Sequence, residues 1–220
     1  MSDVKVIKVG ESVYAGNLSI AEDIRARLRK DHTFLLNVMA SPGAGKSTTL
    51  LRTIEMLGDQ YRIGVMEADI DATVDAEKMA DAGVRSIQIH TGGECAMKSY
   101  MTKEALDEFS TEDLDLLFLE NVGNLVCPAE EDVGASTSIE ILSIPEGDDK
   151  PLKYPLMFTV VQAVLINKTD TMEYFDFDKD SVVEKIHDLN PDVPVFFVSA
   201  KTGDGFDAWT RWLRDQIDKW

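Results

Sequence analysis

The chain has 220 residues, a length that suits one α/β domain with a sizeable buried core. Apolar residues make up 44 % and charged residues 28 %, which excludes a disordered or fibrous protein. The formal net charge is −18, so the average surface repels nucleic acid and anionic membranes. We therefore expect a single domain over residues 1–220 that binds neither nucleic acid nor a membrane.

The beginning of the chain carries no apolar signal segment, and no run of eighteen apolar residues occurs. We therefore expect a cytoplasmic protein. The chain has two cysteines, Cys95 and Cys127. A reducing compartment favours metal ligands or inert thiols over a disulfide for such a pair.

The predicted elements begin with a helical segment over residues 1–31, where Ser19-Ile-Ala-Glu22 has the pattern of a capping box. Short apolar runs then alternate with amphipathic stretches, which predicts a mostly parallel central sheet flanked by helices. Residues 145–155 have a loop-like composition and are expected to form a switch region. Aromatic residues spaced along 206–220 predict a helix packed on the sheet. The predicted strands are 34–40, 63–66, 86–89, 114–119, 139–144, 163–166 and 195–198.

A phosphate-binding loop follows the first predicted strand. The run Ala40-Ser-Pro-Gly-Ala-Gly-Lys-Ser47 precedes a helix-forming segment, although Ala40 replaces the first glycine of the usual pattern. Backbone N–H groups of the loop would face phosphate, Lys46 would contact the β and γ phosphates, and Ser47 would bind Mg²⁺. The expected nucleotide contacts here are Gly43, Ala44, Gly45, Lys46, Ser47 and Thr48.

A guanine-recognition pattern, Asn167-Lys-Thr-Asp170, ends a later strand. Asp170 can accept hydrogen bonds from guanine N1–H and N2–H₂, whereas adenine offers no matching pair of donors. Lys168 would lie along the base plane. The run Ser199-Ala-Lys201 is expected to complete the pocket, so the predicted base contacts are Asn167, Lys168, Asp170, Ser199, Ala200 and Lys201.

Acidic groups for Mg²⁺ and hydrolysis lie between these motifs. Glu120, at the end of the fourth strand, would hold Mg²⁺, and Asp69 would be a second carboxylate near the metal. We expect Asp75 to orient the attacking water and the Gly123 N–H to contact the γ-phosphate. For Asp69 and for Asp75, a helix cap or a solvated acid is the alternative. No arginine has an obvious position to stabilise the transferring phosphoryl group, which predicts slow hydrolysis. The predicted catalytic set is Lys46, Asp69, Asp75, Glu120 and Gly123.

Both cysteines follow predicted strands. Cys127 lies in the segment after Glu120 whose position should depend on the γ-phosphate, and Cys95 follows the third strand in Thr91-Gly-Gly-Glu-Cys95. Two thiolates make an incomplete site for a soft or borderline metal, whereas a two-fold dimer would bring four together. Two buried, inert thiols are the alternative.

These motifs, together with Leu116-Leu-Phe-Leu-Glu-Asn-Val-Gly-Asn-Leu-Val-Cys-Pro128 and Glu146-Gly-Asp148, resemble the HypB family of hydrogenase nickel-incorporation GTPases over nearly the whole chain. The resemblance implies a SIMIBI-type P-loop GTPase that dimerises with GTP. It also implies that Ni²⁺ or Zn²⁺ binds at the dimer interface through Cys95 and Cys127, and that nickel passes to a metalloenzyme precursor with accessory maturation proteins. Family members usually have histidine where this chain has Ala96, so His90 or Glu94 would have to substitute.

Other functions fit part of this pattern. The chain also resembles urease accessory proteins and the chaperone GTPases of cobalamin-dependent mutases, although the Asn-Leu-Val-Cys-Pro run favours HypB. A metal-storage or scaffold protein, in which GTP only sets the oligomeric state, is an alternative from another class. A small-molecule kinase would need an acceptor pocket and a lid, for which the sequence has no pattern.

Overall fold

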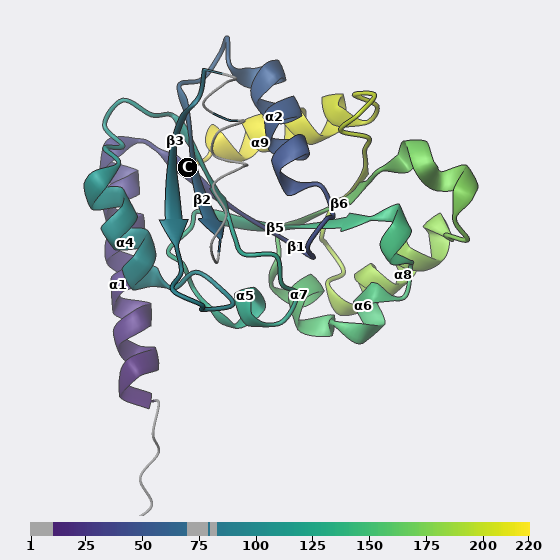
Figure 1. Cartoon of the computed structure of the whole chain (residues 1–220), viewed down its shortest axis with the longest axis horizontal. Coiled ribbons are helices and arrows are strands. Elements are labelled where there is room, and N and C mark those ends of the chain that lie inside the picture. Colours follow the sequence, from purple (N-terminus) through teal and green to yellow (C-terminus); the bar gives the residue numbers. More distant parts are fainter. Residues whose placement is uncertain (1–10, 70–78, 80–82) are drawn as a thin grey trace, which may run out of the picture.

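The computed structural model describes residues 11–69, 79 and 83–220. Its centre is a seven-stranded sheet in the order β3-β2-β4-β1-β5-β6-β7, and every pair of neighbouring strands is parallel (Figure 1). The predicted α/β fold is therefore confirmed. The strands are β1 (Phe34–Ala40), β2 (Ile63–Asp69), β3 (Arg85–His90), β4 (Leu116–Glu120), β5 (Thr137–Ser143), β6 (Ala163–Asn167) and β7 (Val195–Phe197).

Each of the seven predicted strands is present, with boundaries shifted by up to three residues. The five inner strands are mostly buried, because short apolar runs in a parallel sheet are covered on both faces, whereas the edge strands β3 and β7 are only partly buried. The helices are α1 (Glu11–Asp31), α2 (Lys46–Leu57), α4 (Ser99–Glu108), α5 (Cys127–Glu130), α6 (Lys150–Lys153), α7 (Pro155–Val160), α8 (Lys179–Leu189) and α9 (Phe206–Ile217), with 3₁₀ turns η1 (Ile144–Glu146) and η2 (Thr169–Tyr174).

Helices cover both faces of the sheet (Figure 1). Helices α2 and α9 pack on one face, where Leu50 of α2, Trp209 of α9 and Val38 of β1 belong to the same buried apolar cluster. On the other face, α1 and α4 cover one half of the sheet and α7 and α8 cover the other half. The predicted C-terminal helix is thus confirmed, and its aromatic stripe lies in the core.

Two expectations about local structure are wrong. Helix α1 begins at Glu11, so Ser19 lies exposed inside the helix and does not cap its start. Residues 145–155 are not a continuous loop but contain η1, α6 and the first residue of α7. The Ser143 hydroxyl and backbone N–H both donate to the carboxylate of Glu146, which stabilises the η1 turn.

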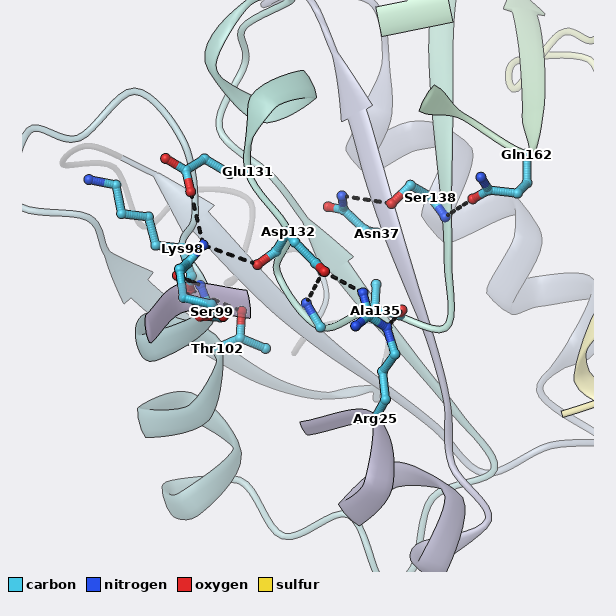
Figure 2. A network of polar contacts seen from close by, with 12 residues as sticks. Arg25, Asn37, Lys98, Ser99, Thr102, Glu131, Asp132, Ala135, Ser138 and Gln162 are labelled. Atoms are coloured by element: carbon cyan, nitrogen blue, oxygen red, sulfur yellow. Dashed lines mark hydrogen bonds and ion pairs between the residues drawn. The ribbon is translucent and has the colours of Figure 1, made fainter. Parts of the chain in front are cut away.

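The N-terminal helix is tied to the segment that follows α5 (Figure 2). Arg25 of α1 pairs with Asp132 and also donates from Nε to the carbonyl oxygen of Ala135 at 3.1 Å. These contacts place α1 beside the chain that leads from Cys127 to β5. None of the helices that the structure describes combines the length and the apolar character needed to cross a bilayer.

Candidate nucleotide and metal site

The loop between β1 and α2 has the backbone of a phosphate-binding loop. Gly43 and Gly45 have φ values of +78° and +99°, which side chains rarely tolerate. A Cβ at Gly45 would also lie 2.6 Å from Nδ2 of Asn167. Gly45 is the N-cap of α2 and has no side chain that could cap the helix. The first N–H groups of a 12-residue helix therefore face the position where phosphate would bind.

The predicted Mg²⁺ ligands from the P-loop and β4 lie together. Ser47 Oγ donates a hydrogen bond to Glu120 Oε1 at 2.9 Å, and Glu120 is 6 % exposed at the end of β4. Strand β4 lies between β1 and β2, so its carboxyl end opens beside the P-loop. A hydroxyl and a carboxylate in contact are the donor types that Mg²⁺ prefers, so the residues fit this ion.

The remaining predicted phosphate-site residues lie on the same edge of the sheet or outside the described residues. Asp69 ends β2, whose register with β4 places it next to the end of β4. Gly123 approaches the P-loop so closely that a Cβ there would lie 3.1 Å from Cα of Pro42. Lys46 is the first residue of α2. Asp75 lies outside the described residues.

The residues predicted to recognise guanine meet the 199–201 loop, as expected from the sequence. Asp170 Oδ1 accepts a hydrogen bond from Ser199 Oγ at 2.7 Å, and Lys201 Nζ lies 3.8 Å from Asp170 Oδ2. Lys168 donates from Nζ to the carbonyl oxygen of Gly43 at 2.6 Å. A cavity of about 270 Å³ lies between the two motifs and the start of α2. It is lined by Gly45, Thr48, Asn167, Lys168, Asp170, Thr171, Ala200 and Lys201.

A buried carboxyl group on β5 was not predicted. Glu140 is fully buried and lies opposite Met39 of β1, and neither of its carboxylate oxygens has a hydrogen-bond partner among the described residues. Burial raises the pKa of Glu140 well above its ordinary value, and nearby Glu146 raises it further, while Lys46 and Lys150 oppose the shift. The available signal was one acidic residue inside an apolar run, Ile139-Glu-Ile-Leu142.

The two cysteines are joined. Cys95 and Cys127 form a disulfide, with their Cα atoms 6.0 Å apart and a sequence separation of 32. The expectation of ligands or inert thiols over a disulfide is therefore wrong for this structure. It was drawn from the cellular compartment alone, whereas the fold brings the segments after β3 and β4 together at one edge of the sheet.

The described residues supply an incomplete metal site. They contain no group of three or more His, Cys, Asp or Glu side chains arranged to hold an ion, so neither His90 nor Glu94 joins the cysteines in such a group. Glu94 instead pairs with Lys98 at 3.1 Å. Any transition-metal site built on Cys95 and Cys127 needs further ligands and needs both sulfurs reduced, because thiolates are the metal ligands.

The sheet order, the P-loop ahead of α2 and the Asn-Lys-x-Asp motif define a P-loop nucleotide-binding protein of the SIMIBI type. The family model described as "CobW/HypB/UreG, nucleotide-binding domain" matches residues 34–197. The chain belongs to this family and, within it, to the HypB hydrogenase maturation factors.

The similarity extends over nearly the whole chain. The hydrogenase maturation factor HypB of Azotobacter chroococcum mcd 1 is 39 % identical over 98 % of this chain and 71 % of its own length. The crystal structure of HypB from Helicobacter pylori in complex with nickel is 36 % identical, with a TM-score of 0.87 over 93 % of this chain and 96 % of that one. HypB from Archaeoglobus fulgidus is 35 % identical, with a TM-score of 0.86 over 92 % and 99 % of the two chains.

Proposed function

We propose that this chain is a GTP-hydrolysing metallochaperone that dimerises in a GTP-dependent manner and delivers nickel, or a related metal, during hydrogenase maturation. One observation carries the proposal. The segment from Glu120 to Cys127 starts at a carboxylate that contacts the Ser47 hydroxyl in the P-loop and ends at a cysteine whose sulfur becomes a thiol when the disulfide is reduced. A change at the phosphate site would thus reach a metal ligand within eight residues. The names of the relatives support hydrogenase maturation, and the nickel complex of the Helicobacter pylori protein supports the metal.

Guanine selection would fall to Asp170. Its carboxylate is oriented by Ser199 and borders the cavity, so it can accept both donors on the guanine edge. Adenine would leave this acceptor unpaired, so the site should discriminate against adenine nucleotides by about 10⁴-fold or more. Lys168 and Ala200 line the same cavity and would contact the base on two sides.

Phosphate binding and hydrolysis would use the other end of the site. The backbone of Gly43, Ala44 and Gly45 would surround the phosphates, Lys46 would supply a positive charge, and Thr48 would extend the contacts into α2. Mg²⁺, held by Ser47 and Glu120 with Asp69 nearby, would neutralise charge developing on the phosphoryl oxygens. We assign Asp75 to orienting the water and the Gly123 N–H to the γ-phosphate. With no arginine in place, hydrolysis is expected to be slow.

The metal site would be completed by a second copy of the chain. Reduced Cys95 and Cys127 from two protomers give four thiolates, a set that suits Ni²⁺ or Zn²⁺. Large apolar side chains available for a dimer interface are exposed at Val126, Leu152, Leu156, Tyr174 and Phe175. Because the proposed cycle consumes GTP and needs reduced thiols, we place it in the cytoplasm, with a metalloenzyme precursor and accessory maturation proteins as partners.

The decisive experiment is a titration of the reduced protein with Ni²⁺ and Zn²⁺ in the presence of GDP or a non-hydrolysable GTP analogue. Sedimentation measured on the same samples gives the oligomeric state. We expect a dimer with the analogue, a metal affinity that depends on the nucleotide, and loss of high-affinity binding in Cys95→Ala and Cys127→Ala. Equal metal affinity in both nucleotide states, with no transfer to an acceptor, would instead favour a metal-storage or scaffold protein.

A further inference from the structure

The segment between Glu120 and Cys127 carries two asparagines whose side chains have different partners. Asn121 is 1 % exposed, and its Oδ1 accepts hydrogen bonds from the N–H groups of Met97 at 3.1 Å and Val122 at 2.9 Å. Met97 is two residues from Cys95. The Asn121 side chain therefore attaches the end of β4 to the loop that carries Cys95.

Asn124 contacts the sulfur of Cys127 directly. Its Oδ1 accepts from the N–H groups of Val126 at 2.7 Å and Cys127 at 3.4 Å, which forms a tight turn. Its Nδ2 donates to Cys127 Sγ at 3.5 Å. An N–H directed at sulfur stabilises negative charge on a thiolate and orients it toward a metal.

Each asparagine directly follows a residue that contacts the P-loop. Glu120, in contact with Ser47, precedes Asn121, and Gly123, packed against Pro42, precedes Asn124. Any displacement of the segment by a γ-phosphate thus moves the partners of both cysteines. We propose that Asn121 and Asn124 are positioning residues that couple the phosphate site to the metal-binding thiols, one asparagine for each cysteine. This inference rests on the proposed function.

The Asn121 side chain is part of a chain of hydrogen bonds between polar side chains. Its Nδ2 donates to Asn37 Oδ1 at 3.1 Å, and Asn37 Nδ2 donates to Ser138 Oγ at 3.1 Å. Figure 2 shows the Asn37 side chain directed at Ser138, whose N–H in turn donates to Gln162. This chain fixes which face of the Asn121 amide points at Met97. Asn37 therefore supports the Asn121 amide from the side opposite Met97, and its replacement gives a graded test of the same link.

The first test measures coupling as the ratio of Ni²⁺ dissociation constants of the reduced protein with GDP and with the GTP analogue. In Asn121→Ala this ratio should fall to about one, because the link to Met97 is lost. In Asn37→Ala the ratio should fall in the same direction but by less, because Asn121 can still accept from Met97 and Val122 while its Nδ2 loses a partner. Asn121→Ser, which is too short to reach Met97, replaces Asn121→Ala if that variant does not fold, with the same expected result. A wild-type ratio in the Asn121 variant would overturn the proposal.

The second test separates the sulfur contact from the turn at Asn124. Asn124→Ser keeps a side-chain oxygen that can accept the Val126 N–H, but its hydroxyl ends one bond short of the amide nitrogen that donates to sulfur. Both Asn124→Ala and Asn124→Ser should bind Ni²⁺ about tenfold or more weakly in each nucleotide state, with GTP affinity retained. Wild-type metal affinity in Asn124→Ser would contradict the assigned role. A wild-type protein whose metal affinity ignores the nucleotide would contradict the proposed function itself, so the two failures are distinguishable.

Discussion

Asn167 on β6 donates a hydrogen bond from its side-chain amide to the carbonyl oxygen of Ala44 in the P-loop, at 3.0 Å. Its Oδ1 accepts the N–H of Ala200 at 3.2 Å. One side chain therefore sets the separation between the phosphate-binding loop and the loop beside the base. The two ends of a nucleotide would meet a preformed site, which reduces the ordering that binding requires.

Gly45→Ala should severely impair nucleotide binding. The new Cβ would meet Asn167 Nδ2 at 2.6 Å and would occupy a backbone conformation with φ of +99°. Gly43→Ala is the matched control, because its φ is +78° but nothing lies within 4 Å of the new Cβ. We expect about 1 kcal/mol of lost stability for Gly43→Ala and clearly more for Gly45→Ala. Thermal unfolding and GTP calorimetry would measure both, and equal effects would contradict the close-contact explanation.

Asp170→Asn should abolish the preference for guanine. The amide presents an N–H donor where the carboxylate presented a second acceptor. One guanine N–H therefore loses its acceptor and faces another donor. We expect GTP affinity to fall by at least about 100-fold, with the ratio of GTP to ATP affinity approaching one. Asp176→Asn, an exposed carboxylate outside the cavity, should leave both affinities unchanged. Unchanged GTP binding in Asp170→Asn, measured by calorimetry, would remove the base assignment.

Glu140→Gln should change how stability depends on pH. The pKa of Glu140 is raised above its ordinary value of 4.5 by burial and by Glu146, against the attraction of Lys46 and Lys150. The folded chain therefore retains a proton that the unfolded chain releases. Its stabilising contribution is present below pH 4.5 and is lost as pH rises through the raised pKa, with a slope of up to about 1.4 kcal/mol per pH unit.

Replacement of Glu140 by glutamine removes this titration. The free energy of unfolding of Glu140→Gln should therefore exceed that of the wild type by a margin that grows as pH rises above 4.5. Urea unfolding at several pH values would measure it. Glu104→Gln on the exposed side of α4 serves as the control and should leave the wild-type pH dependence unchanged. A constant difference between Glu140→Gln and wild type at all pH values would show that this carboxyl does not titrate differently on folding.

Oxidation should abolish high-affinity nickel binding. While Cys95 and Cys127 are bonded to each other, neither sulfur is available as a thiolate. Dithiothreitol supplies two electrons and two protons and converts the disulfide to two thiols, so nickel binding should return after reduction and disappear again with oxidised glutathione. Equilibrium dialysis would follow the metal, and a thiol assay would follow the cysteines. Equal nickel affinity in the two redox states would exclude these sulfurs as the main ligands.

Local sequence patterns were sufficient for much of the nucleotide site. The P-loop and the Asn-Lys-x-Asp motif each occupy a few consecutive residues after a strand, and parallel strands place their carboxyl ends on one edge. The contacts of Ser47 with Glu120 and of Asp170 with Ser199 could therefore be anticipated from order along the chain. The start of α1 could not be anticipated. The capping pattern at Ser19 indicates a helix that starts there, whereas α1 already includes the residues from Glu11.

The sequence by itself determined the sheet, the phosphate loop and the Asn-Lys-x-Asp motif at the end of β6, because periodicity and short motifs specify them locally. Only the tertiary structure decided that Cys95 bonds to Cys127, that Asn121 holds the loop of Met97, and that Glu140 is buried. Each of these depends on the distance between segments far apart in the chain. Such distances follow from how strands β3, β4 and β5 are ordered in the sheet, which no single stretch of sequence encodes.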